Sequence, residues 1–182
     1  MRGRIMVAGL AGLLVSGCAA EVAPVAVPPP GPVALDVSAA SSGGACRLLD
    51  FAVIEQVVKV RFDVAAASER DDTHTCVVRA ERAALPELML SVSETTIDKA
   101  SFGADAVPDK ATKVTGLGQQ AYRRTVAASG GRGPVAEVGW LASDGRLATL
   151  TWTGARGAER TAADKVAGDL IALAKKVDTR AL

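Results

Sequence analysis

The pattern of hydrophobic and polar positions divides the chain into three parts. Residues 5–15 form an apolar run broken only by glycine and alanine, and a stretch rich in proline, serine and glycine follows. From there to the C-terminus, apolar positions recur with the periods of strands and helices. We therefore expect a signal peptide at 1–17, an extended tether at 18–44 and a single folded domain at 45–182.

Several short segments of the expected domain have the pattern of strands. Apolar and polar residues alternate fully in residues 58–64 and again in residues 88–93, and the apolar run 75–78 lies between them. A period of two is typical of a strand that buries one face. We predict three strands here, with a charged turn at residues 68–72 between the first two. A further strand is predicted near residues 121–123.

The best-specified element is a hairpin over residues 135–153, for which two registers compete. A two-residue turn would pair Trp140 with Thr149 and mix threonine with apolar residues on both faces. A three-residue loop, with Gly145 in the left-handed conformation, pairs Trp140 with Ala148 instead. This second register, which we predict, gathers the apolar side chains on one face: Val138, Trp140, Ala142, Ala148, Leu150 and Trp152. Both tryptophans are therefore expected in the core rather than on an exposed sugar-binding platform.

Helical spacing of apolar residues marks the two ends of the domain. Residues 48–56 are weakly helical, and residues 97–104 are compatible with a short helix. Near the C-terminus, Thr161 and Asp164 resemble a capping box, and the apolar stripe that follows predicts an amphipathic helix. The predicted fold class is α+β: a mainly antiparallel sheet of five or six strands, with the N-terminal helix and the amphipathic C-terminal helix packed on one face.

The first residues have the features of an export signal. Arg2 and Arg4 precede the apolar run, which is too short to cross a bilayer as a permanent helix. The run ends in Leu-Val-Ser-Gly before Cys18, which resembles the lipobox of bacterial lipoproteins. The resemblance implies cleavage before Cys18, lipidation of this residue and attachment to the cell membrane on its extracytoplasmic face. The alternative is ordinary cleavage near Ala19 and Ala20, with Cys18 lost or left as a free thiol.

Composition narrows the range of partners. Lys and Arg number 21 against 20 Asp and Glu, and two of the arginines lie in the signal peptide. The chain therefore has no excess of positive charge to hold a polyanion, and no nucleic-acid partner is expected. Five of the eight prolines lie in the tether, which we interpret as a spacer between the membrane and the domain.

After Cys18 the chain has two further cysteines, Cys46 and Cys76. In an oxidising compartment we expect them to form a disulfide that closes a loop of about 30 residues. Their spacing is not that of a redox Cys-x-x-Cys motif. Because His74 is the only histidine, no metal site and no cofactor is expected.

Three further patterns resemble chemical motifs but have simpler structural interpretations. Gly116 and Gly118 fit the letters of G-x-G-x-x-A, yet no clear strand and long helix flank them, so we interpret them as turn glycines with positive φ. For hydrolysis, His74 would need a nucleophile and an acid, and no G-x-S-x-G motif occurs, so we interpret it as a loop-end histidine beside a strand. Asp71 and Asp72 lack calcium-loop spacing and are interpreted as a solvated turn.

Short motifs are spread over most of the mature chain. They are the lipobox at Cys18, the proline- and serine-rich tether, Cys46-Arg47-Leu48-Leu49, Cys76, Gly116-Leu117-Gly118 with Ala121, and the late hairpin with its amphipathic helix. Together they resemble a family of actinobacterial cell-envelope lipoproteins of unknown function. Members more often have an aromatic residue after the second cysteine, where this chain has Val77. The resemblance implies an envelope lipoprotein, supports the Cys46–Cys76 pairing and implies no catalytic residue.

Three functions are compatible with these features. The first is a non-enzymatic binding or interaction module that captures an envelope ligand or partner protein. The second is a ligand carrier or accessory subunit of a transporter or sensor, which needs a cavity lined by residues such as Leu88, Leu90 and Val92. The third is an envelope hydrolase built on His74. We expect the first, and no enzyme, because the sequence contains no evident catalytic constellation.

Overall fold

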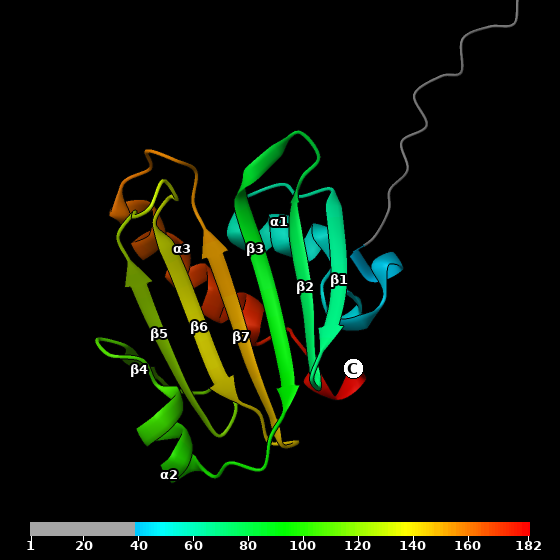
Figure 1. The fold of residues 1–182 in the computed structure, drawn as a ribbon, viewed down its shortest axis with the longest axis vertical. Helices are drawn as coiled ribbons and strands as arrows, with labels where there is room; N and C mark the ends of the chain where they lie inside the picture. The colour runs from blue at the N-terminus through cyan, green and yellow to red at the C-terminus, as the bar shows by residue number, and fades with distance from the viewer. Residues whose placement is uncertain (1–38) are drawn as a thin grey trace, which may run out of the picture. The chain divides into compact units, whose positions relative to one another are not determined.

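The protein folds around one seven-stranded sheet. The computed structural model describes residues 39–182; the expected signal peptide, Cys18 and residues 19–38 lie outside the described residues. The strand order is β1-β2-β3-β7-β6-β5-β4, and every neighbouring pair is antiparallel (Figure 1). The strands are β1 (Val64–Arg70), β2 (Thr73–Ala80), β3 (Ala83–Glu94), β4 (Thr112–Val114), β5 (Gln120–Val126), β6 (Val135–Leu141) and β7 (Arg146–Thr153). The predicted α+β class is confirmed, with seven strands where five or six were expected.

The two longest helices cover one face of this sheet. Figure 1 shows α1 and α3 behind the strands; α3 packs on β5, β6 and β7, and α1 packs against α3. The helical segments are η1 (Ala39–Ser42), η2 (Gly44–Leu48), α1 (Phe51–Val58), α2 (Lys99–Ser101), the π-helical turn η3 (Phe102–Ala106), α3 (Arg160–Ala174) and η4 (Thr179–Ala181). The N-terminal and C-terminal helices that the sequence predicts are thus present as α1 and α3.

The main hydrophobic core lies between this helical layer and the sheet. Alternate residues of β2, β3, β6 and β7 point into it, as expected for strands with one buried face. Trp140 and Trp152 are 2% and 5% exposed, so both tryptophans belong to this core. Leu88, Leu90 and Val92 are fully buried in the same cluster.

A smaller cluster lies on the opposite face, at one corner of the sheet. Phe102 packs with Tyr122 and Leu141, and the ring centroids of Phe102 and Tyr122 lie 6.1 Å apart. Tyr122 follows the core residue Ala121 along β5, and successive side chains of a strand point to opposite faces. The predicted short helix near residues 97–104 is therefore found as α2 and η3, which cover this corner.

The expected strand at residues 58–64 is not formed. Val58 ends α1 instead, and Lys59 takes a left-handed conformation with φ 60° that turns the chain away from the helix. Val58 and Phe62 are still buried, because the helix end and the linker after it both pack on the core. Strand β1 begins only at Val64, so alternation here reflects burial on one side of a linker rather than pairing.

The charged turn between the first two strands is shorter than predicted. Residues 68–70 belong to β1, and only Asp71 and Asp72 form the turn, with φ values of 47° and 59°. Two consecutive residues with positive φ suit a tight two-residue hairpin, for which aspartate is well adapted. Both aspartates are exposed, in agreement with their interpretation as a solvated turn.

The register predicted for the late hairpin is confirmed. Trp140 pairs with Ala148, and Val138 pairs with Leu150. Gly145 has φ 78°, the left-handed conformation that the three-residue loop requires. The backbone N–H of Ala142 donates to the carbonyl of Arg146 at 2.8 Å and closes the loop.

The expected capping box at the start of α3 is wrong. The helix begins at Arg160, its N-cap is Glu159, and no side chain makes a capping hydrogen bond there. The Asp164 carboxylate instead accepts a hydrogen bond of 2.6 Å from the Thr125 hydroxyl on β5. Asp164 therefore hydrogen-bonds to a residue of a neighbouring strand and does not cap its own helix. The buried stripe of α3 agrees with the prediction and also includes Leu173.

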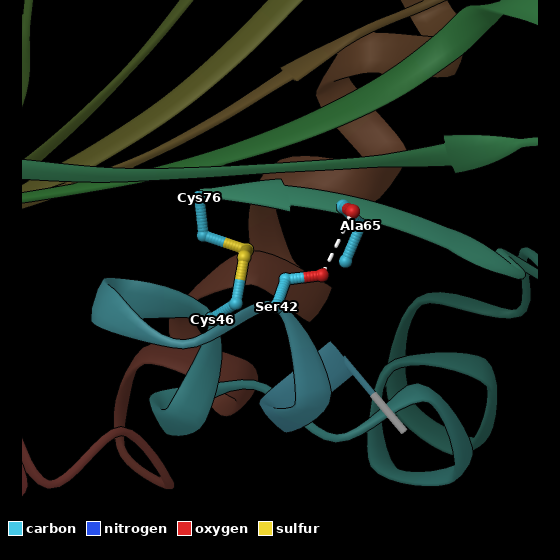
Figure 2. The surroundings of a disulfide bond; sticks show 4 residues. All are labelled: Ser42, Cys46, Ala65 and Cys76. Atoms are coloured by element: carbon cyan, nitrogen blue, oxygen red, sulfur yellow. Dashed lines mark hydrogen bonds between the residues drawn. A yellow bond between two sulfur atoms is a disulfide. The ribbon is translucent and has the colours of Figure 1, made fainter. Parts of the chain in front are cut away.

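The folded unit starts before residue 45. Residues 39–44, expected to belong to the tether, form η1 and the start of η2. Ala39 is fully buried, and the Ser42 hydroxyl donates to the carbonyl of Ala65 at 2.9 Å (Figure 2). This contact places η1 beside β1, the strand at one edge of the sheet.

Candidate functional site

The disulfide predicted between Cys46 and Cys76 is present. Its S–S distance is 1.94 Å and the two Cα atoms are 4.9 Å apart (Figure 2). Cys46 lies in η2 and Cys76 in β2, and both are fully buried. The bond joins the N-terminal segment to the sheet, which is a structural role.

His74 lies within β2 rather than at the end of a loop, as the sequence had suggested. Its Nδ1 is 3.3 Å from a carboxylate oxygen of Glu69, in a contact that is an ion pair only when the imidazole is protonated and whose geometry makes no hydrogen bond. Glu69 faces it across the β1–β2 pair, and its side chain is 67% exposed. Within residues 39–182, no nucleophilic side chain hydrogen-bonds to His74, so the pair with this exposed acid is not a hydrolytic triad.

Gly116 and Gly118 are turn residues, as interpreted from the sequence. Their φ values are 72° and 55°, and β5 follows them where a nucleotide fold would have a helix. A Cβ on Gly118 would lie 2.3 Å from the carbonyl oxygen of Leu141. Glycine at this position therefore allows close approach of two backbones.

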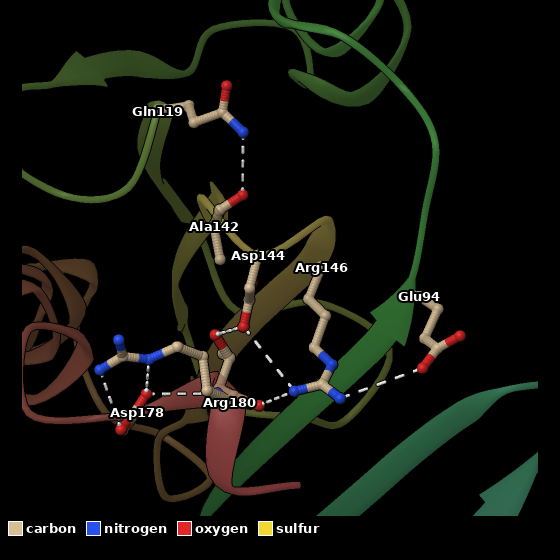
Figure 3. A network of polar contacts seen from close by, with 8 residues as sticks. Glu94, Gln119, Ala142, Asp144, Arg146, Asp178 and Arg180 are labelled. Carbon is tan, nitrogen blue, oxygen red and sulfur yellow. Dashed lines mark hydrogen bonds and ion pairs between the residues drawn. The ribbon is translucent and has the colours of Figure 1, made fainter.

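Two hollows lie next to the β6–β7 turn, and the charged side chains around them are already paired with one another. Figure 3 shows Arg146 between Asp144 and Glu94, and Arg180 paired with Asp178. The Arg146 guanidinium also donates to the carbonyl of Thr179, whose hydroxyl donates to Asp144 at 2.8 Å. These contacts fasten the C-terminal segment to the hairpin, so we assign them to the fold.

A third hollow, a groove of about 560 Å³, lies along the outer side of β5. Three segments far apart in sequence form it: the loop before β4 with the first residue of that strand, β5 itself with Ala127, and the first turns of α3. The lining residues are Asp109, Lys110, Thr112, Arg123, Arg124, Thr125, Val126, Ala127, Arg160, Asp164 and Ala167. We refer to this hollow as the edge groove.

The edge groove exists because β4 is shorter than its neighbour. β4 pairs only with residues 121–123 of β5, whereas β5 continues to Val126. The outer backbone of residues 124–126 therefore has no strand beside it. An unpaired edge presents N–H and C=O groups that are available to a ligand.

The polar groups of the edge groove are only partly satisfied by one another. The Arg160 guanidinium donates to the Thr125 hydroxyl at 3.3 Å and lies 3.9 Å from the Asp164 carboxylate. Within residues 39–182, neither Lys110 nor Arg123 has an ion-pair or side-chain hydrogen-bond partner, and both are exposed. The groove thus contains two cations that are not neutralised.

Arg124 is held by a buried carboxylate on the other face of the sheet. Glu137 of β6 accepts hydrogen bonds from Arg124 Nε at 2.9 Å and Nη2 at 3.0 Å, and from Tyr122 Oη at 2.9 Å. These hydrogen bonds raise the pKa of Arg124. Burial, followed by the charge of Glu137, raises the pKa of Tyr122. The network fixes the arginine and stabilises the β5–β6 pair beside the groove.

Sequence reasoning identified neither the edge groove nor this network. The alternation along residues 135–141 places Glu137 on the face opposite Trp140, which alone suggests an exposed acid. Its true partners come from the register of β5 with β6, in which Arg124 lies directly opposite Glu137. That register is decided by tertiary packing, and no short motif encodes it.

Comparison with known proteins finds no matching family model, no matching curated protein and no matching solved structure. Between residues 39 and 182, the chain contains no helix that is both long and apolar enough to cross a membrane. The same residues contain no cluster of three or more His, Cys, Asp or Glu side chains suited to a metal ion. The functional conclusion therefore depends on the chemistry of the edge groove.

Proposed function

We propose that this protein is a lipid-anchored lipoprotein of the cell envelope and that its domain is a non-enzymatic binding module whose ligand occupies the edge groove. The main support for this proposal is that two cations without a counter-charge, Lys110 and Arg123, lie in a groove formed by three separate segments. Pockets that combine a few convergent polar groups with a rigid scaffold are typical of binding sites. The lipobox-like sequence before Cys18 and the likeness to actinobacterial envelope lipoproteins support the anchoring.

The scaffold favours binding over catalysis. Two of the three segments that line the groove, β5 of a continuous sheet and α3, which packs on that sheet, are held by the main core. His74, the only histidine, lies on β2, four strands away from β5. At about 4.8 Å per strand it is roughly 20 Å from the groove, too far to act on a ligand there.

The carrier alternative receives less support from the packing. It needs a cavity between helices and sheet, and Leu88, Leu90 and Val92 were the residues expected to line it. All three are fully buried in the core, and none lines the edge groove or the two hollows beside the β6–β7 turn. A surface groove suits a module that holds a ligand reversibly at the envelope.

Anchoring is tested by comparing the full chain with its Cys18→Ser variant in a bacterial host. We expect the full chain in the membrane fraction with incorporated labelled fatty acid, and the variant without label. Two acyl chains suffice for stable attachment, whereas an unlipidated chain has no such anchor. Equal labelling of both proteins would contradict the proposed anchor.

Binding is tested with native mass spectrometry of the full chain, purified in an uncharged detergent and incubated with an envelope extract. We expect a retained ligand mass that is lost in the double variant Lys110→Gln/Arg123→Gln. The matched control is Lys59→Gln/Arg79→Gln, since Lys59 shares the left-handed conformation of Lys110 and Arg79 is an exposed strand arginine like Arg123. Retention by all three proteins would place the ligand elsewhere, and retention by none would contradict a binding module.

A further inference from the structure

The charges of the edge groove point to the chemical class of its ligand, an inference that rests on the proposed function. Four cationic side chains line it, Lys110, Arg123, Arg124 and Arg160, against two carboxylates, Asp109 and Asp164. The Asp164 carboxylate accepts the Thr125 hydroxyl at 2.6 Å and lies 3.9 Å from the Arg160 guanidinium, and Glu137 binds Arg124, so Lys110 and Arg123 are the cations that keep no bound counter-charge. The local charge is therefore positive in a chain whose formal net charge is only +1.

The donors around the groove differ in kind and complement one another. Arg123 offers a planar guanidinium that binds two oxygens of one anion, and Lys110 offers a point charge. Both come from exposed positions with no competing acid bound to them, so an anion would not have to break an existing ion pair. The Thr112 hydroxyl on β4 adds a neutral donor to the same lining.

An extended acidic peptide fits the groove less well. Addition of a peptide strand needs a run of unpaired edge, and β4 leaves only residues 124–126 of β5 uncovered. Arg124, which belongs to this uncovered stretch, is already bound by Glu137 on the other face of the sheet through two hydrogen bonds. A compact oxyanion uses the side-chain donors and does not require a long edge.

We propose that the edge groove binds a phosphate-type oxyanion, with Lys110 and Arg123 as its charged donors. The phosphate group belongs either to a soluble or polymeric polyol phosphate of the envelope or to a lipid headgroup. Both sources present the same tetrahedral anion to the groove. They differ in whether the anion is free in solution or held in the membrane surface, which an experiment can separate.

The test uses the full lipidated chain in uncharged maltoside micelles, which contain no phosphate. Titration calorimetry with glycerol 3-phosphate at low ionic strength is expected to show saturable binding that salt weakens. Lys110→Gln/Arg123→Gln should weaken it by at least about tenfold, because the loss of even one charge-assisted hydrogen bond costs roughly that factor. The control Lys59→Gln/Arg79→Gln should bind like the wild type.

A second arm adds phosphatidylglycerol to the micelles. If the headgroup is the ligand, it should compete with glycerol 3-phosphate in the wild type; if the ligand is soluble, the titration should be unchanged.

Three results would overturn the oxyanion site. If no phosphate probe binds while the groove variant still loses the ligand from envelope extract, the oxyanion proposal is wrong and the binding module stands. Equal weakening in the groove variant and the control would also overturn the oxyanion site. Binding of an acidic peptide in place of phosphate would replace it with a peptide site.

Discussion

Gly139 lies directly beneath the ring of Tyr122. The two residues are paired across β5 and β6, and a Cβ on Gly139 would come within 2.5 Å of the ring atoms Cε1 and Cζ. The missing side chain therefore lets the tyrosine lie flat over the sheet and reach Glu137 with its hydroxyl. This arrangement connects the small second core to the arginine at the edge groove.

Gly139→Ala should displace the Tyr122 ring and destabilise the protein by about 1–3 kcal/mol, the usual cost of overpacking. Urea unfolding followed by circular dichroism measures the loss. Gly168→Ala is the matched control, because Gly168 is exposed in α3 with nothing near its Cβ position. Alanine there should stabilise the helix by about 0.5–1 kcal/mol. Equal effects of the two changes would contradict the role assigned to Gly139.

Glu137→Gln should also lower stability, by about 1–3 kcal/mol. The amide oxygen can still accept from Tyr122 and from Arg124 Nε, but the amide N–H2 then faces the second donor of Arg124, Nη2, and the arginine loses its counter-charge. Chemical denaturation measures the effect. Glu87→Gln, a partly exposed position on the same face, is the control and should change little. A silent Glu137→Gln would mean that the network adds no net stability.

Tyr122 should remain protonated in the folded protein at pH values where free tyrosine ionises. Burial and the charge of Glu137 raise its folded-state pKa above the ordinary tyrosine value of 10.0, so this group's contribution to stability is fully present below pH 10. It is lost as the pH rises above 10, because the unfolded chain then releases the proton more readily. Tyr122 is the only tyrosine, so tyrosinate absorbance reports on it alone. Ionisation near pH 10 without unfolding would contradict this expectation.

Removing the disulfide should cost about 3–4 kcal/mol in the chain-entropy model for a sequence separation of 30 residues. The double variant Cys46→Ala/Cys76→Ala tests this by urea unfolding. Cys18→Ser should leave unfolding of the domain unchanged, since Cys18 is not part of the Cys46–Cys76 bond. A loss in the double variant no larger than in Cys18→Ser would show that the bond is dispensable.

Arg146→Gln should release the C-terminal segment. The arginine side chain is 19% exposed and joins Asp144, Glu94 and the carbonyl of Thr179, so we expect a loss of about 1–2 kcal/mol. Faster digestion of the C-terminus by carboxypeptidase provides the local readout. Arg180→Gln removes an exposed pair with Asp178 and should have little effect. Similar digestion of both variants would argue against a fastening role for Arg146.

Structural features that depend on residues close together in the sequence could be predicted from it. The register of the 135–153 hairpin follows from its alternation and from one glycine that can adopt positive φ, so Trp140 was placed opposite Ala148 correctly. The Cys46–Cys76 bond followed from the presence of two cysteines after Cys18. Residues 58–64 show the limit, since a linker that packs one side on the core has the same alternation as a strand.

Features that depend on distant segments were decided only by the tertiary structure. Lys110, Arg123 and Arg160 span fifty positions and meet because β4 stops short of the end of β5 and α3 begins beside it. Asp164 was expected to cap its own helix, but it accepts a hydrogen bond from Thr125 on β5 instead. The sequence by itself determined the local geometry through backbone preferences and periodicity. Tertiary packing alone determined which polar groups are neutralised and which remain available, because charge pairing depends on distances that no local pattern encodes.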